Sequence, residues 1–358
     1  MKNFAGFDFQ ILLAIFIVAI LGLSMIWSLV PNLFVHQLIF VLIGLFFFFL
    51  FSRLDFRVFE HLSWIIYVTC LVFLVSTFLF GQVTRGSIRW IQIGNFTVQP
   101  SEIVKPFLVC FFASLLSKEE KLSFSRFVGV LILLSLPLFF IFKQPDLGST
   151  LVVLFSFLGI LLASNVSLSY VFTGLGFILV SSPVFWFFLK GYQKARVLSF
   201  LNPYLDPLGS GYHLIQSVIT VGSGGFFGRG LGKGTQSHLQ FLPEHHTDFI
   251  FASLSEELGF LGAMVLLLCY FLILFKILKI GRNSSSPFGT LVCFGIFSLF
   301  LFQIFVNIGM NMGILPITGV TLPLVSYGGS SVLATMISLG IVESIARAKK
   351  PEETIEIK

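Results

Sequence analysis

The segment Phe249–Phe275 reads FIFASLSEELGFLGAMVLLLCYFLILF, and it is apolar over a length that can cross a lipid bilayer. A transmembrane α-helix needs about 20 consecutive, mostly apolar residues. Two glutamates, Glu256 and Glu257, nevertheless lie inside this segment. Because a carboxylate inside a membrane is costly and rarely faces lipid, the segment predicts both a membrane fold and a functional region.

The residues just before this segment are polar and end in Thr247 and Asp248. Thr247 is a predicted N-cap, which places Asp248 in the first helical turn, where the helix dipole favours a carboxylate. Glu256 lies roughly 12 Å further along the helix and about 80° around it, and Glu257 points away from Asp248. We expect Asp248 and Glu256 to face a water-filled cavity, and another helix or a backbone donor to hold Glu257. The alternative for both glutamates is structural pairing.

The composition excludes a soluble domain. Apolar residues make up 56% of the 358 residues, charged residues make up 11%, and Phe occurs 47 times. The chain is therefore expected to be a single all-α polytopic membrane domain over residues 1–358, because helices satisfy their own backbone hydrogen bonds in lipid. Ten spans are predicted, at residues 8–29, 35–53, 62–82, 100–117, 127–143, 147–165, 169–190, 248–279, 289–313 and 325–348.

The distribution of Lys and Arg predicts the orientation of these spans. Thirteen of these residues fall on the side of the two termini and eight on the other side, so both termini are expected in the cytoplasm. The net charge of +6 follows from this topology and gives no reason to expect nucleic acid as a partner. Four cysteines lie within spans, where a free thiol behaves as a small apolar group, so neither a disulfide nor a cysteine-bound metal is expected: Cys70, Cys110, Cys269 and Cys293.

Polar sequence gathers in the predicted outer loops, above all in the large loop at residues 191–247 between the seventh and eighth spans. The first outer loop contains Arg85, Arg89 and Trp90, and its SIRWIQIG portion alternates as a short strand or an interfacial segment does. Trp with nearby arginines is typical of a headgroup anchor, and the alternative is an anionic ligand held by the guanidinium groups.

Two further polar groups lie at the outer ends of spans. Pro100 is expected at the first position of the fourth span, where Glu102 either completes a capping box or pairs with the deeper Lys105 three residues on. Pairing is favoured, because a buried lysine needs a counter-ion. Asp146 follows a proline before the sixth span and is interpreted as a helix N-cap.

The large outer loop has seven glycines between Gly222 and Gly234, and it is interpreted as a set of tight turns or as a backbone cradle for a diphosphate. It is not an ATP-binding P-loop, because Lys233 is followed by Gly234. The adjacent His245 and His246 lack the spacing of a zinc site, so no metal site is predicted. A divalent cation such as Mg²⁺ or Mn²⁺, held loosely by Asp248 or by a diphosphate, stays open.

The ninth span carries Gln303, Asn307 and Asn311 at four-residue intervals, which forms one polar stripe and is interpreted as helix-packing contacts. The following residues, 314–331, contain two prolines and a glycine pair. This predicts a broken helix or a dipping loop, and such breaks normally line a cavity.

Over nearly its whole length the chain resembles the SEDS family (shape, elongation, division and sporulation). The GTQSHLQF run at residues 234–241 and the short N-terminus favour the elongation branch of that family. The motifs that carry the resemblance are RWIQIG at 89–94, QPSEIVK at 99–105, QPDLGS at 144–149, NPYLDPLGSGYHLIQS at 202–217, LPEHHTDFIFASLSEELGFLG at 242–262 and GILPITGVTLPLVSYGGSS at 313–331.

The resemblance implies a glycosyltransferase that polymerises lipid II at the outer face of the bacterial cytoplasmic membrane. It implies a class B penicillin-binding protein and the elongation complex as partners, with membrane lipids around the chain. The family's essential aspartate corresponds to Asp248, which would act as the general base of an inverting transfer. Substrate-binding roles are implied for Arg85, Arg89, Trp90, Glu102, Lys105, Asp146, Arg196 and Glu256, and the cations among them would stabilise the departing diphosphate.

Two other functions fit part of the same pattern. A lipid II flippase would also have ten spans, intramembrane ionisable residues and broken helices. A non-catalytic scaffold would leave Glu256 and Lys105 without a role. Replacing Asp248 separates these readings, because a transferase that uses it as a base cannot tolerate asparagine there, whereas a transporter in which it only caps a helix can.

Overall fold

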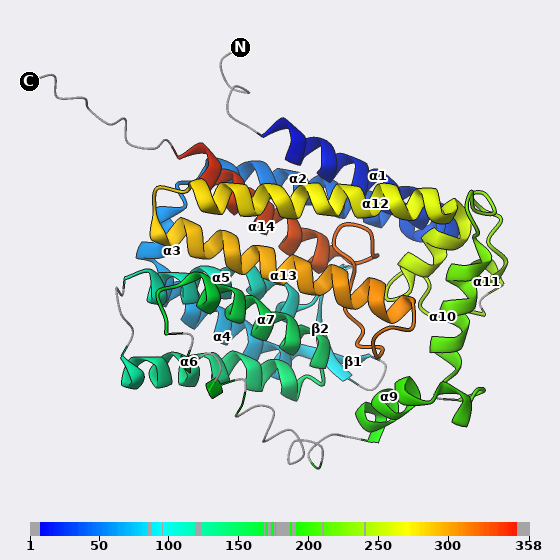
Figure 1. Cartoon of the computed structure of the whole chain (residues 1–358), viewed down its shortest axis with the longest axis horizontal. Helices are drawn as coiled ribbons and strands as arrows, with labels where there is room; N and C mark the ends of the chain where they lie inside the picture. Colours follow the sequence, from blue (N-terminus) through cyan, green and yellow to red (C-terminus); the bar gives the residue numbers. More distant parts are fainter. Residues whose placement is uncertain are drawn as a thin grey trace, which may run out of the picture.

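The computed structural model describes residues 8–84, 87–94, 96–118, 123–167, 191–209, 211–239 and 241–348, and a few isolated residues between 169 and 187. Long helices lie side by side along the longest axis of the molecule (Figure 1). Within the described residues eight helices are long and apolar enough to cross a membrane: α1 (Phe9–Leu29), α2 (Pro31–Arg53), α4 (Ser63–Phe80), α5 (Pro100–Ser117), α6 (Phe124–Lys143), α12 (Ile250–Asn283), α13 (Pro287–Asn311) and α14 (Gly329–Arg347).

This arrangement confirms the all-α polytopic membrane fold. A ninth predicted span corresponds to α7 (Leu147–Ala163), which is apolar but shorter than the other eight. The predicted span at 169–190 lies mostly outside the described residues. A short helix, α3 (Arg57–His61), connects α2 to α4.

Local sequence signals explain where several helices begin. Asp8 is the N-cap of α1 and accepts a hydrogen bond from the Gln10 N–H, which satisfies one of the free donors of the first turn. Pro100 begins α5 as predicted, and α2 and α13 begin with prolines in the same way. Proline suits this position because its fixed φ is helical and its missing N–H has no partner there to lose.

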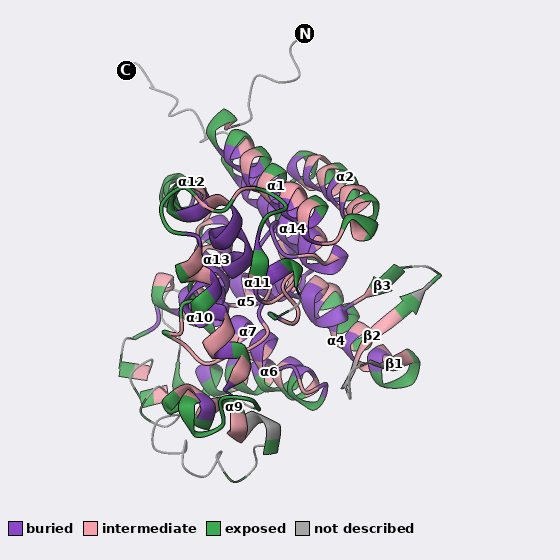
Figure 2. Cartoon of the chain, turned by 90° about the vertical axis from the view of Figure 1, so that its right-hand side faces the viewer, coloured by how far each residue is buried: buried purple, intermediate pink, exposed green. Residues whose placement is uncertain are grey.

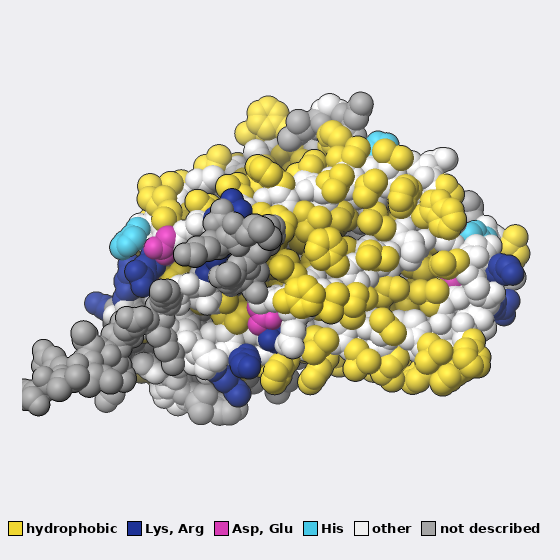
Figure 3. All heavy atoms as spheres, turned by 90° about the horizontal axis from the view of Figure 1, so that it is seen from above, with side chains coloured by type: hydrophobic (Ala, Val, Ile, Leu, Met, Phe, Trp, Pro, Cys, Tyr) yellow, Lys and Arg dark blue, Asp and Glu magenta, His cyan; other side chains and the backbone are white. Residues whose placement is uncertain are grey.

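The helices differ in how far they are buried. α5 and α14 are buried along most of their length, and they lie near the middle of the bundle when it is viewed along its long axis (Figure 2). α2, α4 and α6 bury only a narrow stripe each and expose large apolar side chains such as Phe46, Val72 and Ile132. Hydrophobic side chains cover the middle of one face, and Lys and Arg gather toward its ends (Figure 3). This distribution fits a chain whose outer helices contact lipid.

One end of the bundle holds the described ends of the chain. The Asp8 N–H donates to Glu343 Oε1 over 2.9 Å, which joins the start of α1 to the C-terminal part of α14. Lys276 Nζ, near the C-terminus of α12, lies 2.7 Å from Asp8 Oδ2. The described ends of the chain therefore lie at the same end of the bundle, and the N-terminal end of α12 lies at the opposite end of the molecule.

The opposite end carries the smaller elements. Residues 81–98 form a three-stranded antiparallel sheet of β1 (Gly81–Thr84), β2 (Ser87–Ile93) and β3 (Phe96–Val98), which confirms the strand predicted from SIRWIQIG. The large loop is not irregular throughout, because it contains three α-helices and one 3₁₀ turn. These are α9 (Gly191–Leu201), the turn Pro203–Leu205, α10 (Tyr212–Ser223) and α11 (Thr235–His238).

The helix α12 is broken at Gly259, a feature that the apolar pattern did not predict. Gly259 has φ 66° and ψ −164°, which is not helical, and a Cβ there would lie 2.2 Å from the Gly228 backbone N. The N–H groups of Phe260 and Leu261, which follow the break, donate to the carbonyls of Gly225 and Phe226. The outer loop thus fills the break, and residues 250–258 form a separate buried helical segment.

Residues 312–328 connect α13 to α14 without helical structure, which confirms the break predicted from their prolines and glycines. This connection is buried in large part: Leu322, Leu324 and Val325 are at most 2% exposed. The Tyr270 hydroxyl of α12 donates to the Pro323 carbonyl over 2.7 Å. The connection therefore lies inside the bundle, at the end where α12 begins.

Candidate active site

Asp248 lies two residues before α12, not in its first turn. α12 begins at Ile250 with Phe249 as its cap residue, and no side chain caps it. The prediction of Thr247 as an N-cap is therefore wrong, since its hydroxyl donates instead to the Glu244 carboxylate over 3.1 Å. Asp248 is partly exposed at the end of the bundle away from the chain termini.

The segment that carries Asp248 is fixed to the connection between α13 and α14. The Ser326 hydroxyl donates to the Thr247 carbonyl over 2.7 Å, and the Tyr327 N–H donates to the His246 carbonyl over 2.9 Å. Gln37 of α2 is fully buried, donates to the Ser326 carbonyl and accepts from the Gly328 N–H, each over 3.3 Å. A helix far away in the sequence thus supports the turn that holds the aspartate.

The backbone carbonyl of Asp248 accepts two side-chain amides from α13. Asn307 Nδ2 donates to it over 3.1 Å and Asn311 Nδ2 over 3.0 Å. The Asp248 carboxylate lies against the α13–α14 connection, because a Cβ on Gly319 would be 3.4 Å from its Oδ2. The polar stripe of α13 therefore contacts the candidate base directly.

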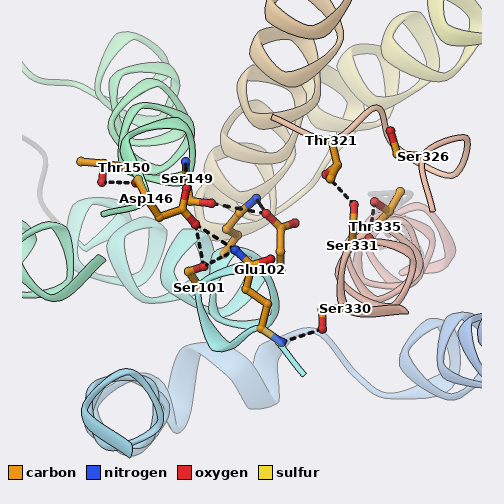
Figure 4. A network of polar contacts seen from close by, with 12 residues as sticks. Ser101, Glu102, Asp146, Ser149, Thr150, Thr321, Ser326, Ser330, Ser331 and Thr335 are labelled. Carbon is orange, nitrogen blue, oxygen red and sulfur yellow. Dashed lines mark hydrogen bonds and ion pairs between the residues drawn. The ribbon is translucent and has the colours of Figure 1, made fainter. Parts of the chain in front are cut away.

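A second group of acidic residues lies where α5 and α7 begin. Asp146 caps α7, as predicted, by accepting from the Ser149 N–H over 3.1 Å. Its other oxygen accepts from the Gln99 amide at 2.9 Å and the Ser101 hydroxyl at 3.0 Å. Asp146 is 4% exposed, so both of its oxygens are engaged in a buried network (Figure 4).

Glu102 and Lys105 form the predicted ion pair on one face of α5. Both are buried, with Lys105 2% and Glu102 6% exposed, and the Ser149 hydroxyl donates to Glu102 over 3.4 Å (Figure 4). The pair packs beside Gln303 of α13 and Thr335 of α14, around a space too small for a water molecule.

The α13–α14 connection lies between the two acidic groups and contacts both. Beside Asp146, a Cβ on Gly148 would be 3.0 Å from the Thr318 carbonyl and 2.8 Å from a Val320 methyl. Asn307 Nδ2 donates to the Val320 carbonyl over 2.7 Å while it also contacts the Asp248 carbonyl. Residues 318–320 thus separate the Asp146 network from Asp248 by the width of one backbone segment.

Glu256 does not face a water-filled cavity, and that expectation is wrong. Its side chain is 0% exposed and accepts from the backbone N–H groups of Gln236 and Ser237, at 2.8 and 3.1 Å, and from the Ser237 hydroxyl. Glu256 therefore anchors the start of the short helix α11. The break at Gly259 explains the difference, because it lets the outer loop reach a carboxylate that a continuous helix would hold deeper in the membrane.

Glu257 is held by another helix, as expected. Its carboxylate accepts from the Ser28 hydroxyl of α1 at 2.7 Å and lies 2.8 Å from His238 Nε2. The glycine-rich loop follows the tight-turn interpretation: Gly225, Gly228, Gly230 and Gly232 all have positive φ. The N–H groups of Arg229 and Gly230 donate to the carbonyls of Glu256 and Glu257, so they are not available to cradle a phosphate.

The remaining predicted cations that the structure describes, Arg89 and Arg196, lie at the same end of the molecule. Arg89 and Trp90 are on β2 and half-buried, and Arg89 Nε is buried without a hydrogen-bond partner among the described residues. Arg196 lies exposed on α9, whereas Arg85 lies outside the described residues. Burial, followed by the charge of Arg196, lowers the pKa of His213, so Arg196 lies within electrostatic reach of α10.

The histidines before Asp248 are not arranged as metal ligands. Burial, the largest cause, lowers the pKa of His245 and so favours its neutral form near pH 7. Its Nδ1 lies 3.1 Å from the Leu242 carbonyl, and its ring is 5.3 Å from that of His246. Among the described residues no three His, Cys, Asp or Glu side chains converge as a metal site would require.

Comparison with known proteins identifies the family. Residues 6–351 match the family model that groups FtsW, RodA and SpoVE and is described as cell cycle protein. The chain belongs to the FtsW/RodA/SpoVE family. It is 42% identical to the peptidoglycan glycosyltransferase MrdB of Escherichia coli K12 over 298 residues, which cover 82% of this chain and 80% of MrdB.

Other relatives and solved structures extend the FtsW/RodA/SpoVE assignment. The stage V sporulation protein E of Bacillus subtilis is 38% identical over 87% of this chain and 86% of its own. A chain of a peptidoglycan synthase complex that coordinates polymerization and crosslinking matches with TM-score 0.84 and 30% identity, over 96% of this chain and 99% of that one. RodA of Thermus thermophilus matches with TM-score 0.74 and 26% identity, over 96% and 98%.

The sequence of this FtsW/RodA/SpoVE family member indicated only part of the role of two asparagines. Asn307 and Asn311 were interpreted mostly as helix-packing contacts, which the bond from the Ala252 N–H of α12 to Asn311 confirms, but their contacts with the Asp248 carbonyl were not predicted. Their four-residue spacing in an otherwise apolar span was the available signal. That signal does not reveal the partner, because Asp248 is about 60 residues earlier in the chain, and only the fold brings the two together.

Proposed function

We propose that this protein is a peptidoglycan glycosyltransferase that polymerises lipid II into glycan strands during bacterial cell elongation. The observation that carries the proposal is the placement of Asp248. It is a partly exposed carboxylate on a rigidly held turn, at the end of the bundle opposite the termini, in a chain 42% identical to MrdB. MrdB is named as a peptidoglycan glycosyltransferase. For the proposed transfer of a lipid-linked sugar, the site needs a base.

Asp248 is proposed to act as the general base. It would take the proton from the 4-hydroxyl of the acceptor sugar as that oxygen bonds to the anomeric carbon of the donor. The bond from that carbon to the polyprenyl diphosphate breaks at the same time, and the diphosphate leaves with the electron pair. An α-linked donor that gives a β product is inverted, so one base and no covalent sugar intermediate suffice. A positioned base contributes typically about 10²- to 10⁴-fold in rate.

Stabilisation of the departing diphosphate is assigned to cations at the same end of the molecule. Arg89 is the strongest candidate among the described residues, because its Nε is buried and still lacks an acceptor. Arg196 is exposed on α9, and Arg85 is proposed for the same role on the basis of the family resemblance alone. Lys105 already has Glu102 as its counter-ion, so its charge is less available. Such groups act where charge develops in the transition state.

The substrate would enter along the membrane, with its lipid tail in the bilayer. We propose that both termini are cytoplasmic, which places Asp248 at the outer face. Lys276, near the C-terminus of α12, pairs with Asp8 at the end of the bundle opposite to the end that carries Asp248. A class B penicillin-binding protein is the proposed partner, and the similarity to a chain of a peptidoglycan synthase complex supports it.

The described residues offer no built site for a divalent cation. A Mg²⁺ or Mn²⁺ ion brought by the diphosphate of the substrate stays a proposal. It is tested by removing divalent cations with EDTA and adding each metal back.

The test compares the wild type with Asp248→Asn, each purified alone and with the class B partner. Labelled lipid II is added, glycan strands are resolved on a gel, and moenomycin silences contaminating transferases of the other type. Asp248→Asn should reduce polymerisation by about 10²- to 10⁴-fold, because an amide cannot take the proton. Asp55→Asn is the matched control: Asp55 only accepts from the Arg57 N–H at the opposite end of the bundle, so activity should be retained.

Polymer from the wild type and from Asp55→Asn, but not from Asp248→Asn, supports the transferase and its base together. Polymer from Asp248→Asn at the wild-type rate removes Asp248 from the mechanism. If no form makes polymer while liposomes that contain the wild type move lipid II between leaflets, the flippase function takes its place.

A further inference from the structure

The first turn of α12 lacks one backbone hydrogen bond, and a side-chain amide lies between the two backbone groups that would form it. In an α-helix the N–H of residue 252 would donate to the carbonyl of residue 248. Here the Ala252 N–H donates instead to Asn311 Oδ1 over 3.1 Å, and the Asp248 carbonyl accepts from Asn311 Nδ2 over 3.0 Å. The side-chain amide has the same donor and acceptor as a peptide unit. Asn311 is therefore inserted between two backbone groups that would otherwise bond to each other.

This insertion holds Asp248 outside the helix. If the Ala252 N–H bonded directly to the Asp248 carbonyl, α12 would begin one residue earlier with Asp248 as its cap residue, and the carboxylate would move and rotate with the backbone. The inserted amide keeps the two backbone groups apart by the width of one amide. It also satisfies both of them, so the buried open turn leaves neither group unpaired.

Asn307 supports the same carbonyl from one helical turn away. Its Nδ2 donates to the Asp248 carbonyl over 3.1 Å and to the Val320 carbonyl over 2.7 Å, which links Asp248 to the segment whose Gly319 lies against its carboxylate. Asn311 Nδ2 also donates to the Asn307 carbonyl over 2.7 Å. Both asparagines are 0% exposed. The Asp248 carbonyl is thus bound to α13, and Asn307 also binds the Val320 carbonyl of the α13–α14 connection.

We propose that Asn311, with Asn307 in support, is a positioning residue that sets the place of the Asp248 carboxylate for catalysis. This inference rests on the proposed function, in which Asp248 is the base. The two asparagines act through the backbone carbonyl of Asp248, which both of them contact. A base displaced by about 1 Å can lose roughly 10²-fold in rate, so the spacing set by one amide matters to the reaction.

Two variants test the insertion. Asn311→Leu has a similar volume and removes both the donor and the acceptor, whereas Asn311→Asp keeps the acceptor for the Ala252 N–H and removes the donor to the Asp248 and Asn307 carbonyls. Each should lower kcat for lipid II polymerisation by about 10²-fold with KM unchanged, because the base is misplaced while the substrate contacts remain. Asn307→Leu should lower kcat less, because Asn311 still reaches the carbonyl.

The control separates positioning from general loss of packing. Tyr67→Phe removes another buried side-chain hydrogen bond to a backbone carbonyl, that of Leu133, between α4 and α6. It should lower thermal stability to a similar extent and leave both kcat and KM unchanged. A structure of Asn311→Leu gives a readout that does not depend on activity: α12 should begin at Phe249 with Asp248 as its cap residue, and the Ala252 N–H should bond to the Asp248 carbonyl.

The results distinguish failure of the positioning role from failure of the proposed function. If Asp248→Asn is inactive while the folded Asn311→Leu and Asn311→Asp proteins retain the wild-type kcat, the positioning role is overturned and the proposed function stands. If Asp248→Asn is active, both are overturned. If Asn311→Leu does not fold, the kcat of Asn311→Asp decides by the same criterion.

Discussion

The ion pair of Glu102 and Lys105 is the most deeply buried pair of opposite charges that the structure records. Lys105 is 2% exposed, so its ammonium group has lost nearly all contact with solvent. A charge in such a place is stable only while its partner stays, because desolvation of an uncompensated ion costs several kcal/mol. Replacing only one member of the pair would therefore leave the other charge buried and uncompensated.

Removing one member should be more harmful than removing both. Lys105→Met is expected to destabilise the protein by about 3–5 kcal/mol, because it leaves the Glu102 carboxylate buried and unpaired. The double variant Glu102→Gln with Lys105→Met should recover most of this loss. Thermal unfolding in detergent measures both. Lys276→Met, which breaks the more exposed pair with Asp8, is the control and should cost about 0–1 kcal/mol. Equal destabilisation by the single and double variants would contradict the argument.

At the scale of the elements, α12 and the outer loop form one interlocked unit. The break at Gly259 gives the loop two free N–H groups to bind, at Phe260 and Leu261, and the loop closes the break in return. The buried carboxylates of Glu256 and Glu257 also hold the later part of the outer loop, because they contact Ser237 and His238. The orientation of residues 250–258, and with it the start of α12, depends on this loop.

Gly259→Ala should disrupt this unit. A Cβ at this position meets the Gly228 backbone N at 2.2 Å, and a positive φ adds about 1–3 kcal/mol of strain for a residue other than glycine. We expect a clear drop in the melting temperature of the purified protein, or failure to accumulate in the membrane.

Gly222→Ala is the matched control for this substitution. A Cβ there meets nothing within 4 Å, and the site is helical, so alanine should be tolerated or slightly stabilising. Normal melting of Gly259→Ala would show that the break does not require glycine.

Sequence reasoning succeeded where the cause was local. The Glu102–Lys105 pair follows from a spacing of three on one helix, and the Asp146 cap follows from its place just before an apolar run. It failed for α12, since the apolar pattern continues through Gly259 and gives no sign that the backbone of the outer loop will pack against this position. It also failed for Asn311, whose partner is fixed by the packing of α13 against α12.

At the scale of the whole molecule, the described ends of the chain and the candidate base lie at opposite ends of one bundle. Asp8 contacts Glu343 at one end, and Asp248 lies beside Gly319 at the other. This placement of the chain ends and the candidate base at opposite ends of the bundle suits a transferase whose products stay outside the cell. In the proposed orientation, the outward side is the side with fewer Lys and Arg residues.

Thiol labelling tests this orientation. Leu208, 89% exposed in the large loop, and Arg57, exposed on α3, lie at opposite ends of the bundle. Leu208→Cys should react with a membrane-impermeant maleimide in spheroplasts, whereas Arg57→Cys should react only after permeabilisation. The wild type, whose four cysteines are buried, gives the background. The reverse labelling pattern would invert the proposed topology.

The central position of α14 bears on how the protein is made. α14 is synthesised after α2, α5 and α13, yet it packs against all three of them and is among the most buried of the membrane helices (Figure 2). Ribosomes deliver these three helices to the membrane first, so the place between them can be filled only when α14 arrives. Thr335 and Ser338 of α14 complete the wall beside Glu102 and Lys105. During biosynthesis, this buried ion pair is therefore enclosed only after a segment more than 200 residues later in the chain has left the ribosome.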